Sequence, residues 1–415
     1  MPFDVKDLKL KEQGKKNIEF ARGQMKALLE VKKEFEKTRP FKGKTIGLAL
    51  HVTKETAVLV ETLIAGGAKV AITGCNPLST QDDVAAAMAS EGVNVFAHKG
   101  ETKEQYYEFL NKVLDFKPDF TVDDGCDLVS EIHLKRTELL DTVIAGTEET
   151  TTGVIRLKAM EKDNALKYPV VAVNDNQTKH LFDNYYGTGQ STWDGILRAT
   201  NVLVAGKRVV VCGYGSCGKG VSARASGMGA SVCVVEVNPI RALQAKMDGF
   251  DVMPIEEAVK EADIIVTVTG NKHVVAKEHF SLMKDGVILA NSGHFDVEID
   301  VESLSKGAKS SRQIRPFLEE FVLPSGRKVF LCAQGRLVNL AAAEGHPSEV
   351  MSMSFCGQAL ALEFGAKNRL SPAVHVLPKE VDERIALLQL NALNVRISRL
   401  SKEQEKYMHS WREGT

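Results

Sequence analysis

The sequence lacks any long apolar run and any excess of charge of one sign. No stretch approaches the roughly 18 apolar residues of a membrane-spanning helix, and the charged N-terminus has no apolar signal segment. Lys and Arg number 53 against 54 Asp and Glu, so the net charge of −1 provides no basic field for nucleic acid or acidic membranes. We therefore predict a cytoplasmic protein that binds neither nucleic acid nor a membrane.

Cysteine is sparse, and no two cysteines form a Cys-x-x-Cys pair. Most of the seven lie in or beside strand-like runs: Cys75, Cys126, Cys212, Cys217, Cys233, Cys332 and Cys356. Disulfide frameworks and structural zinc sites usually show closely spaced cysteines. We therefore expect reduced core residues and no metal site.

A glycine-rich stretch after the apolar run 209–211 predicts a dinucleotide site at the start of a helix. Gly213 permits a tight turn, Gly215 lets the backbone approach a pyrophosphate, and Gly218 allows close helix–strand packing. The next strand ends at Glu236, close to the spacing of about 20 residues expected for the acid that binds a ribose diol. Because a carboxylate there repels a 2′-phosphate, we predict NAD rather than NADP. The alternative is an ordinary glycine turn in an α/β unit.

Strand-like and helix-like segments alternate along most of the 415 residues, which predicts parallel sheets covered by helices. We expect an α/β protein with two doubly wound parallel-sheet domains. One is a substrate-binding domain at 1–185 and 346–378, and the other is a Rossmann NAD-binding domain at 186–345. Residues 10–37 should form one packing helix, and 379–415 a helical extension for oligomerisation, with helix over 387–399.

Polar clusters follow five of the predicted strands of the first domain. They are His51, Cys75-Asn76, Asp123-Asp124, 147–152 and Asn174-Asp175. Any one of them could simply cap a helix. Because the carboxyl ends of parallel strands meet at one edge, five together favour a polar pocket there.

At this point the sequence resembles the S-adenosylhomocysteine hydrolase family over nearly its whole length. The resemblance rests on segments that occur in order at 50–57, 75–82, 123–125, 148–153, Lys179 with 182–184, 213–215, 293–296 and 335–340. It implies a two-domain α/β fold, usually tetrameric, with NAD held tightly through the cycle.

The implied chemistry breaks a thioether at C5′ of a ribose, where sulfur is a poor leaving group. Oxidation at C3′ acidifies the C4′ hydrogen, homocysteine leaves by β-elimination, water adds, and re-reduction regenerates NAD. The predicted function is thus reversible, NAD-dependent hydrolysis of S-adenosyl-L-homocysteine, a small nucleoside thioether, to adenosine and L-homocysteine.

The resemblance assigns the catalytic roles. Lys179 is the base at the 3′-hydroxyl, and Asp183, four residues later, controls the protonation of Lys179. Asp124 is the base at C4′. His51 and His294 protonate the leaving sulfur and activate the water. Substrate binding falls further on Thr53, Glu55, Thr56, Glu149, His346 and Met351, with Glu55 facing the 6-amino group. Cofactor binding falls further on Thr150, Thr151, Thr152, Asn184, Arg241, Thr269, Asn271, Asn339 and again His346. Without the resemblance, an ordinary surface ion pair or core histidine would be the simpler interpretation of these residues.

Some positions depart from the family pattern. Thr188 stands where many members carry a cysteine near the nicotinamide, Arg241 replaces a small polar residue, and the usual C-terminal Lys/Tyr tail is missing. Lys54 and Glu344 are unusual near the base pocket, where a lysine donor and a second carboxylate match the edge of a base with a carbonyl at C6. S-inosyl-L-homocysteine is therefore an alternative substrate.

Two further functions remain open at this level. One is a catalytically silent, NAD-sensing relative, which the presence of all five catalytic residues disfavours. The other is a plain dehydrogenase that releases NADH. Such an enzyme would accumulate absorbance of reduced nicotinamide, whereas a closed redox cycle would not.

Overall fold

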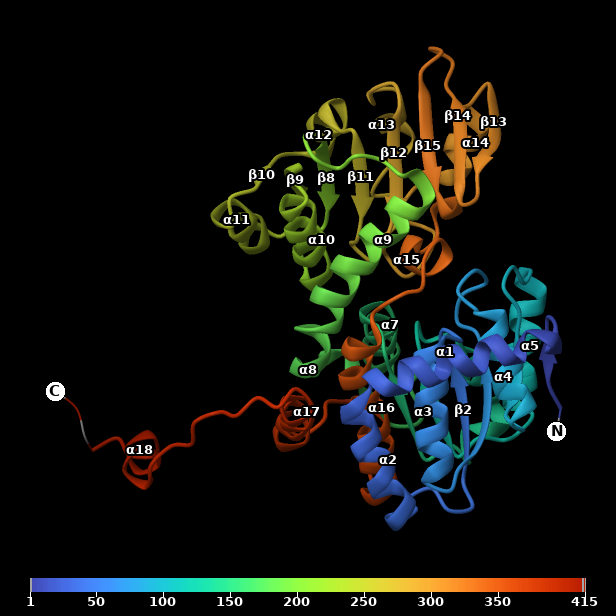
Figure 1. The fold of residues 1–415 in the computed structure, drawn as a ribbon, viewed down its shortest axis with the longest axis vertical. Coiled ribbons are helices and arrows are strands. Elements are labelled where there is room, and N and C mark those ends of the chain that lie inside the picture. Colours follow the sequence, from blue (N-terminus) through green and yellow to red (C-terminus); the bar gives the residue numbers. More distant parts are fainter. Residues whose placement is uncertain (1, 413, 415) are drawn as a thin grey trace.

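The computed structural model describes residues 2–412 and 414, so the predicted domain 1–185 and extension 379–415 are seen without residues 1, 413 and 415. The described chain forms two α/β bodies, one above the other in Figure 1, joined where the chain crosses between them. None of the described helices has the length and apolar character to span a bilayer.

The first body is built on a wholly parallel sheet with strand order β1-β4-β3-β2-β5-β6-β7-β16. Alternate residues of β2 enter different cores: Ile46 and Leu48 face one side of the sheet and Ala49 the other. The strands are β1 Asp4–Val5, β2 Thr45–Ala49, β3 Lys69–Thr73, β4 Asn94–Ala97, β5 Phe120–Asp123, β6 Ala145–Glu148, β7 Val170–Ala172 and β16 Val374–His375.

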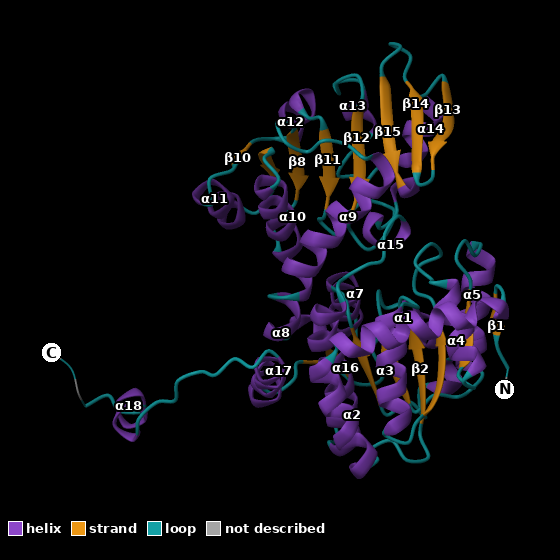
Figure 2. Ribbon diagram, in the orientation of Figure 1, coloured by secondary structure: helices purple, strands orange, loops and turns teal. Residues whose placement is uncertain are grey.

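Helices cover both faces of this sheet (Figure 2). They are α1 Lys11–Gln24, α2 Lys26–Thr38, α3 Lys54–Ala65, α4 Asp82–Ser90, α5 Lys103–Leu114, α6 Asp127–Leu134, α7 Thr151–Lys162, α8 Gln177–His180 and α16 Ser348–Lys367. The single helix predicted over 10–37 is wrong. It breaks at the fully buried Met25, so that α1 packs against α4 while α2 packs against α3 and α16.

The second body has strand order β10-β9-β8-β11-β12-β15-β14-β13. The strands are β8 Arg208–Cys212, β9 Ser231–Val235, β10 Asp251–Val252, β11 Ile264–Thr267, β12 Val287–Asn291, β13 Ser310–Arg315, β14 Leu318–Val322 and β15 Lys328–Cys332. The helices are α9 Thr188–Thr200, α10 Ser216–Gly227, α11 Pro239–Met247, α12 Ile255–Glu261, α13 Lys277–Phe280, α14 Val301–Gly307 and α15 Val338–Ala341.

The predicted fold class is confirmed, with one addition at the edge of the second sheet. There β13, β14 and β15 pair antiparallel. Every residue of β13 is exposed and most are polar. Such a strand lacks the apolar signal of a buried parallel strand, which is why the sequence did not reveal it.

The chain crosses between the two bodies twice. The first is a short π-helical turn, Asp183–Gly187, between α8 and α9, and it rests on α10 so closely that a Cβ on Gly220 would lie 2.0 Å from the Tyr185 carbonyl oxygen. The second runs from α15 through Gly345, His346 and Pro347 to α16. Both crossings reach the gap between the sheets.

After α16 the chain first returns to the first body and then leaves it. Helix α17, Lys379–Ala392, packs against α2, α8 and α16 and buries Ile385. The helix predicted over 387–399 therefore ends early, before Asn394 adopts a left-handed backbone. Beyond it the chain extends away from both bodies to α18, Lys402–Met408 (Figure 1).

Candidate active site between the two sheets

One cavity of about 940 Å³ lies between the bodies and is lined from both. Residues far apart in sequence meet there because the carboxyl ends of the strands of both sheets face this gap. The sequence-predicted residues that line it are His51, Thr53, Glu55, Thr56, Asp124, Glu149, Thr150, Thr151, Thr152, Lys179, Asp183, Asn184, Gly213, Gly215, Glu236, Arg241, Thr269, Asn271, His294, Asn339, His346 and Met351. Gly218 lies behind the lining, as a packing glycine should.

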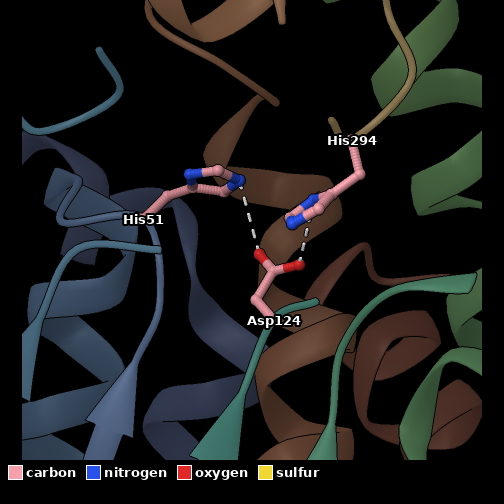
Figure 3. A group of neighbouring side chains, drawn as sticks. All are labelled: His51, Asp124 and His294. Carbon is pink, nitrogen blue, oxygen red and sulfur yellow. Dashed lines mark ion pairs between the residues drawn. The ribbon is translucent and has the colours of Figure 1, made fainter. Parts of the chain in front are cut away.

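Asp124, after β5, lies between two histidines from different bodies (Figure 3). Its Oδ2 is 3.4 Å from His51 Nε2, and its Oδ1 is 3.6 Å from His294 Nδ1. The His294 ring packs directly against Gly125, because a Cβ on Gly125 would lie 2.4 Å from His294 Nε2. The trio therefore forms only when the second body is seated over the first.

Ser79 determines which nitrogen of His51 carries the proton. Its hydroxyl donates to the Asn76 carbonyl oxygen at 3.0 Å, so its oxygen accepts from His51 Nδ1 at 2.7 Å. Burial lowers the pKa of His51 to about 4 despite the neighbouring Asp124, so the ring is neutral. Nε2 thus presents a lone pair to the Asp124 carboxyl group.

Lys179 forms a second cluster, deep in the first body. Its Nζ lies 3.4 Å from Asp183 Oδ1 and 3.6 Å from Glu149 Oε1, and it donates to Asn184 Oδ1 at 2.8 Å. Burial acts to lower the pKa of Lys179, but the two carboxylates outweigh it and raise that pKa above its usual value. Lys179 is an ammonium in this state.

Helix α16 supplies a polar partner to each of three carboxyl groups of the cavity. Ser348 donates to Glu55 Oε1 at 2.6 Å, Ser354 to Asp183 Oδ2 at 2.7 Å, and Gln358 to Glu149 Oε2. Sequence reasoning missed all three donors. Their polar character is a weak signal, because α16 also contains Glu349, Ser352 and Glu363.

Two further buried acids, Asp123 and Glu148, stand at paired positions of β5 and β6. Asp123 accepts from the amides of Asp124 and Val129, and Glu148 from those of Gly125 and Thr150. Burial raises the pKa of Asp123 to about 7 and that of Glu148 well above its usual range. Both acids belong to the polar clusters predicted at the strand ends, although the sequence assigned them no role, and they shape the loops that carry Asp124 and Glu149.

The glycine loop has the steric form of a dinucleotide cradle. Gly213 has φ +106°, and a Cβ on Gly218 would lie 1.9 Å from the Gly213 carbonyl oxygen. At Gly215, by contrast, a Cβ would meet only Arg241 Nη1 at 3.9 Å, which leaves room for a pyrophosphate at the N-terminus of α10. Glu236 accepts from the amides of Tyr214, Val237 and Asn238, which fixes its carboxylate at the end of β9.

Other contacts complete the cofactor side. Glu298, which sequence reasoning missed, accepts from the Thr269 and Gly270 amides and so fixes that loop. Asn339 donates to Ser191, while its Oδ1 is buried without a partner and could accept from a carboxamide. Thr188 carries no thiol itself, but Cys217 of the glycine loop lines the cavity and lies 3.6 Å from Thr188 Oγ1.

Lys54 and Glu344 pair with each other across the two bodies. Lys54 Nζ lies 3.1 Å from Glu344 Oε2 and 3.4 Å from Glu55 Oε1, and Glu344 also contacts Arg198 at 3.3 Å. Lys54 is largely covered, at 12% side-chain exposure, whereas Glu344 is 58% exposed. The pair stands at the rim of the cavity, which Glu344 lines.

These features define the class as an NAD-binding enzyme with two α/β domains and an active site between them. Family models for S-adenosyl-L-homocysteine hydrolase match residues 2–144 and, for its NAD-binding domain, residues 184–345. The chain therefore belongs to the S-adenosyl-L-homocysteine hydrolase family, a family of hydrolases with an NAD-binding domain.

Named relatives and a solved structure agree with this. The chain is 58% identical to the S-inosyl-L-homocysteine hydrolase of Methanocaldococcus jannaschii, and 57% identical to the adenosylhomocysteinase of Sulfurisphaera tokodaii, with 100% of each chain covered. A crystal structure of a dipicolinate synthase chain from Bacillus halodurans superimposes with a TM-score of 0.50 at 14% identity, covering 79% of this chain and 100% of that one, which shows the fold alone.

Proposed function

We propose that the chain catalyses reversible hydrolysis of S-adenosyl-L-homocysteine to adenosine and L-homocysteine through 3′-oxidation, β-elimination, water addition and re-reduction. The observation that carries this proposal is the single cavity in which a dinucleotide cradle, the Lys179 cluster and the Asp124 trio meet. Bound NAD supplies the hydride acceptor and donor. The glycine loop, Glu236, the Thr269 loop and Asn339 would bind it.

In this proposal Lys179 is the base at the 3′-hydroxyl. It rests as an ammonium, because Asp183 and Glu149 raise its pKa. Ribose hydroxyls that bind these carboxylates separate them from Nζ, and burial then lowers the pKa of Lys179 toward that of a base. Ser354 and Gln358 hold the two carboxyl groups in place for this exchange.

In this proposal Asp124 is the base at C4′, and the two histidines protonate the departing sulfur and activate the water. His51 Nε2 lies 3.4 Å from Asp124 Oδ2, and its lone pair faces that oxygen. A proton that Asp124 takes from C4′ can pass to His51 and onward to the departing sulfur. His294 faces the other carboxylate oxygen and is placed to activate the water.

S-Inosyl-L-homocysteine is the second candidate substrate, favoured by Lys54. Glu55 suits a 6-amino group as its acceptor, but Lys54 Nζ lies 3.4 Å from the same carboxylate and could donate to a carbonyl at C6. The names of the relatives support both substrates. Buried polar groups left unpaired make such discrimination large.

The test gives the NAD-loaded protein each thioether separately and follows free homocysteine with a thiol reagent. Faster release from the adenosyl compound supports the main proposal, with Glu55 as the amino-group acceptor. Faster release from the inosyl compound keeps the mechanism and transfers specificity to Lys54. No thiol from either would overturn the proposal.

We also propose the predicted domain division and a homotetramer. The sheets and the crossings support boundaries at 1–185 with 346–378, and at 186–345. The extension 379–415 is the proposed oligomerisation element, supported by exposed apolar side chains at Leu393, Val395, Ile397, Leu400, Tyr407, Met408 and Trp411. Light scattering on the full chain and on a chain ending at Leu393 tests this, since loss of the tail should lower the mass to that of smaller species.

The proposed compartment is the cytoplasm. All seven cysteines are free thiols, six of them buried, which suits a reducing environment. Fractionation of the native cells, followed by detection of the chain, would test this assignment.

A further inference from the structure

We propose that Asp382, on the first helix of the C-terminal extension, is a positioning residue for Lys179, the proposed base. Its carboxylate accepts from the backbone amides of Gln177 at 2.6 Å and Thr178 at 3.2 Å, and from the Thr178 hydroxyl. Gln177 and Thr178 open α8, the short helix that carries Lys179. Figure 1 shows α17, which carries Asp382, beside α8. The role of Lys179 rests on the proposed function, whereas the contacts of Asp382 do not.

Helix α8 is not capped by the residue that precedes it. That residue, Asn176, is of a type that often accepts from the first amides of a helix. Here its side-chain oxygen and nitrogen are buried without a hydrogen-bond partner in the described part of the chain. Its carbonyl oxygen accepts from the third and fourth amides of α8, at 3.1 and 3.0 Å. The first two amides therefore need an acceptor from another element, and Asp382 provides it.

Helix α17 is itself fixed to the first body, so it can hold α8 in place. Ile385, three residues after Asp382, is fully buried in the core that α2 and α16 share. Leu377, just before the helix, packs with apolar residues of β7 and α16. Arg384 forms an ion pair with Glu34 of α2. The carboxylate of Asp382 thus transmits the position of the first body to the start of α8.

The geometry of the Lys179 cluster depends on where α8 lies. Asp183 and Asn184 belong to the same segment as Lys179, so they move with it when α8 shifts. Glu149 follows β6 instead, and its Oε1 lies 3.6 Å from Lys179 Nζ. A shift of α8 would therefore misplace the base relative to Glu149 and to a ribose bound between them. Misplacement of about 1 Å can cost up to about 100-fold in rate, so loss of Asp382 should slow the oxidation step.

The experiment mixes the NAD-loaded full chain with whichever of the two thioethers reacts faster and follows reduced nicotinamide by stopped flow. Asp382→Ala should slow this first oxidation about tenfold, and Asp382→Asn, which keeps one acceptor oxygen, about threefold. Arg384→Ala is the matched control, because it removes another tie of the same helix, to Glu34, and should leave the oxidation rate unchanged. An unchanged rate in Asp382→Ala, or equal slowing in Arg384→Ala, would overturn the proposal.

A second measurement needs no turnover, so it separates this inference from the proposed function. Hydrogen exchange, read by mass spectrometry, compares the segment that contains Gln177 and Thr178 in the unmodified chain and in Asp382→Ala. Exchange there should become at least about tenfold faster in the variant, while helix α7 keeps its rate. If the unmodified chain forms no reduced nicotinamide, the proposed function has failed, and faster exchange would still show that Asp382 holds the helix of Lys179. Equal exchange in both chains would overturn the inference.

Discussion

At the carboxyl ends of its strands, the first sheet presents acids and His51 to the cavity, whereas the second presents chiefly glycines and backbone amides, with His294 beside them. In the first body, Glu149 and Asp183 depend on donors from α16 and on the Lys179 cation. In the second, Gly213 and Gly218 need only local steric freedom. Proton transfer requires movable charges, while a pyrophosphate requires fixed amides, and the two sheets divide these tasks.

The largest expected effect is the loss of the central charge of the first body. Lys179→Ala should reduce turnover by about 10⁴-fold, because it removes the proposed base. The NAD cradle lies on the other body and should still bind. Absorbance of reduced nicotinamide after mixing with substrate, beside a measurement of bound NAD, checks both parts. Retained turnover would contradict the role of Lys179.

Asp124→Asn should separate the steps within the first body. The side chain keeps its size but loses the base at C4′, so homocysteine release should fall about 10³-fold. Oxidation at C3′ depends on Lys179 and should persist. Reduced nicotinamide should therefore accumulate in a stopped-flow trace without thiol release. Release of homocysteine at the normal rate would count against the assignment.

Gly218→Ala tests the second body, where shape rather than charge should matter. The new Cβ would lie 1.9 Å from the Gly213 carbonyl oxygen, so the loop must shift and NAD affinity should fall about 100-fold, or about 2.7 kcal/mol. Gly227→Ala is the matched control, because no atom lies within 4 Å of its Cβ position at the end of the same helix. Calorimetric titration with NAD compares them, and equal affinities would refute the cradle.

Ser354→Ala should have a smaller effect, because it removes a support rather than an acid. The lost hydrogen bond to the charged Asp183 is worth about 1.5 to 3 kcal/mol, which predicts a drop in kcat/KM of at least about tenfold. Ser352→Ala is the control on the same helix: its hydroxyl contacts the Leu28 amide and should affect stability alone. Steady-state kinetics and thermal unfolding of both variants separate the two effects.

The smallest effect is expected at the rim. Glu344→Gln breaks the contacts to Lys54 and Arg198, but Glu344 is 58% exposed, and exposed ion pairs contribute about 1 kcal/mol or less. The ratio of kcat/KM for the adenosyl and inosyl thioethers should therefore change less than about fivefold. A larger change would show that Lys54 and Glu344 discriminate between the two bases, and that residues of both bodies determine substrate preference.

The same contrast between the two bodies explains what sequence alone could provide. The cradle is local: Gly213, Gly215 and Gly218 are close together in one loop, and Glu236 follows the next strand. The supports are not local, since Gln358 meets Glu149 across 209 residues and Ser354 meets Asp183 across 171. Pattern and spacing carry no information about such partners. Strand β13 was not predicted for another reason: its residues are all exposed and mostly polar, so they show no alternation of apolar and polar positions.

One helix supports three of the acids, and this limits how the protein can change. Ser348, Ser354 and Gln358 reach Glu55, Asp183 and Glu149 from fixed positions along α16. Inserting or deleting one residue between Ser348 and Ser354 would rotate Ser348 by about 100° relative to Ser354 and Gln358, so that the three donors could no longer all reach their acids. Substrate range can thus evolve here by substitution, while changes in helix length are barred.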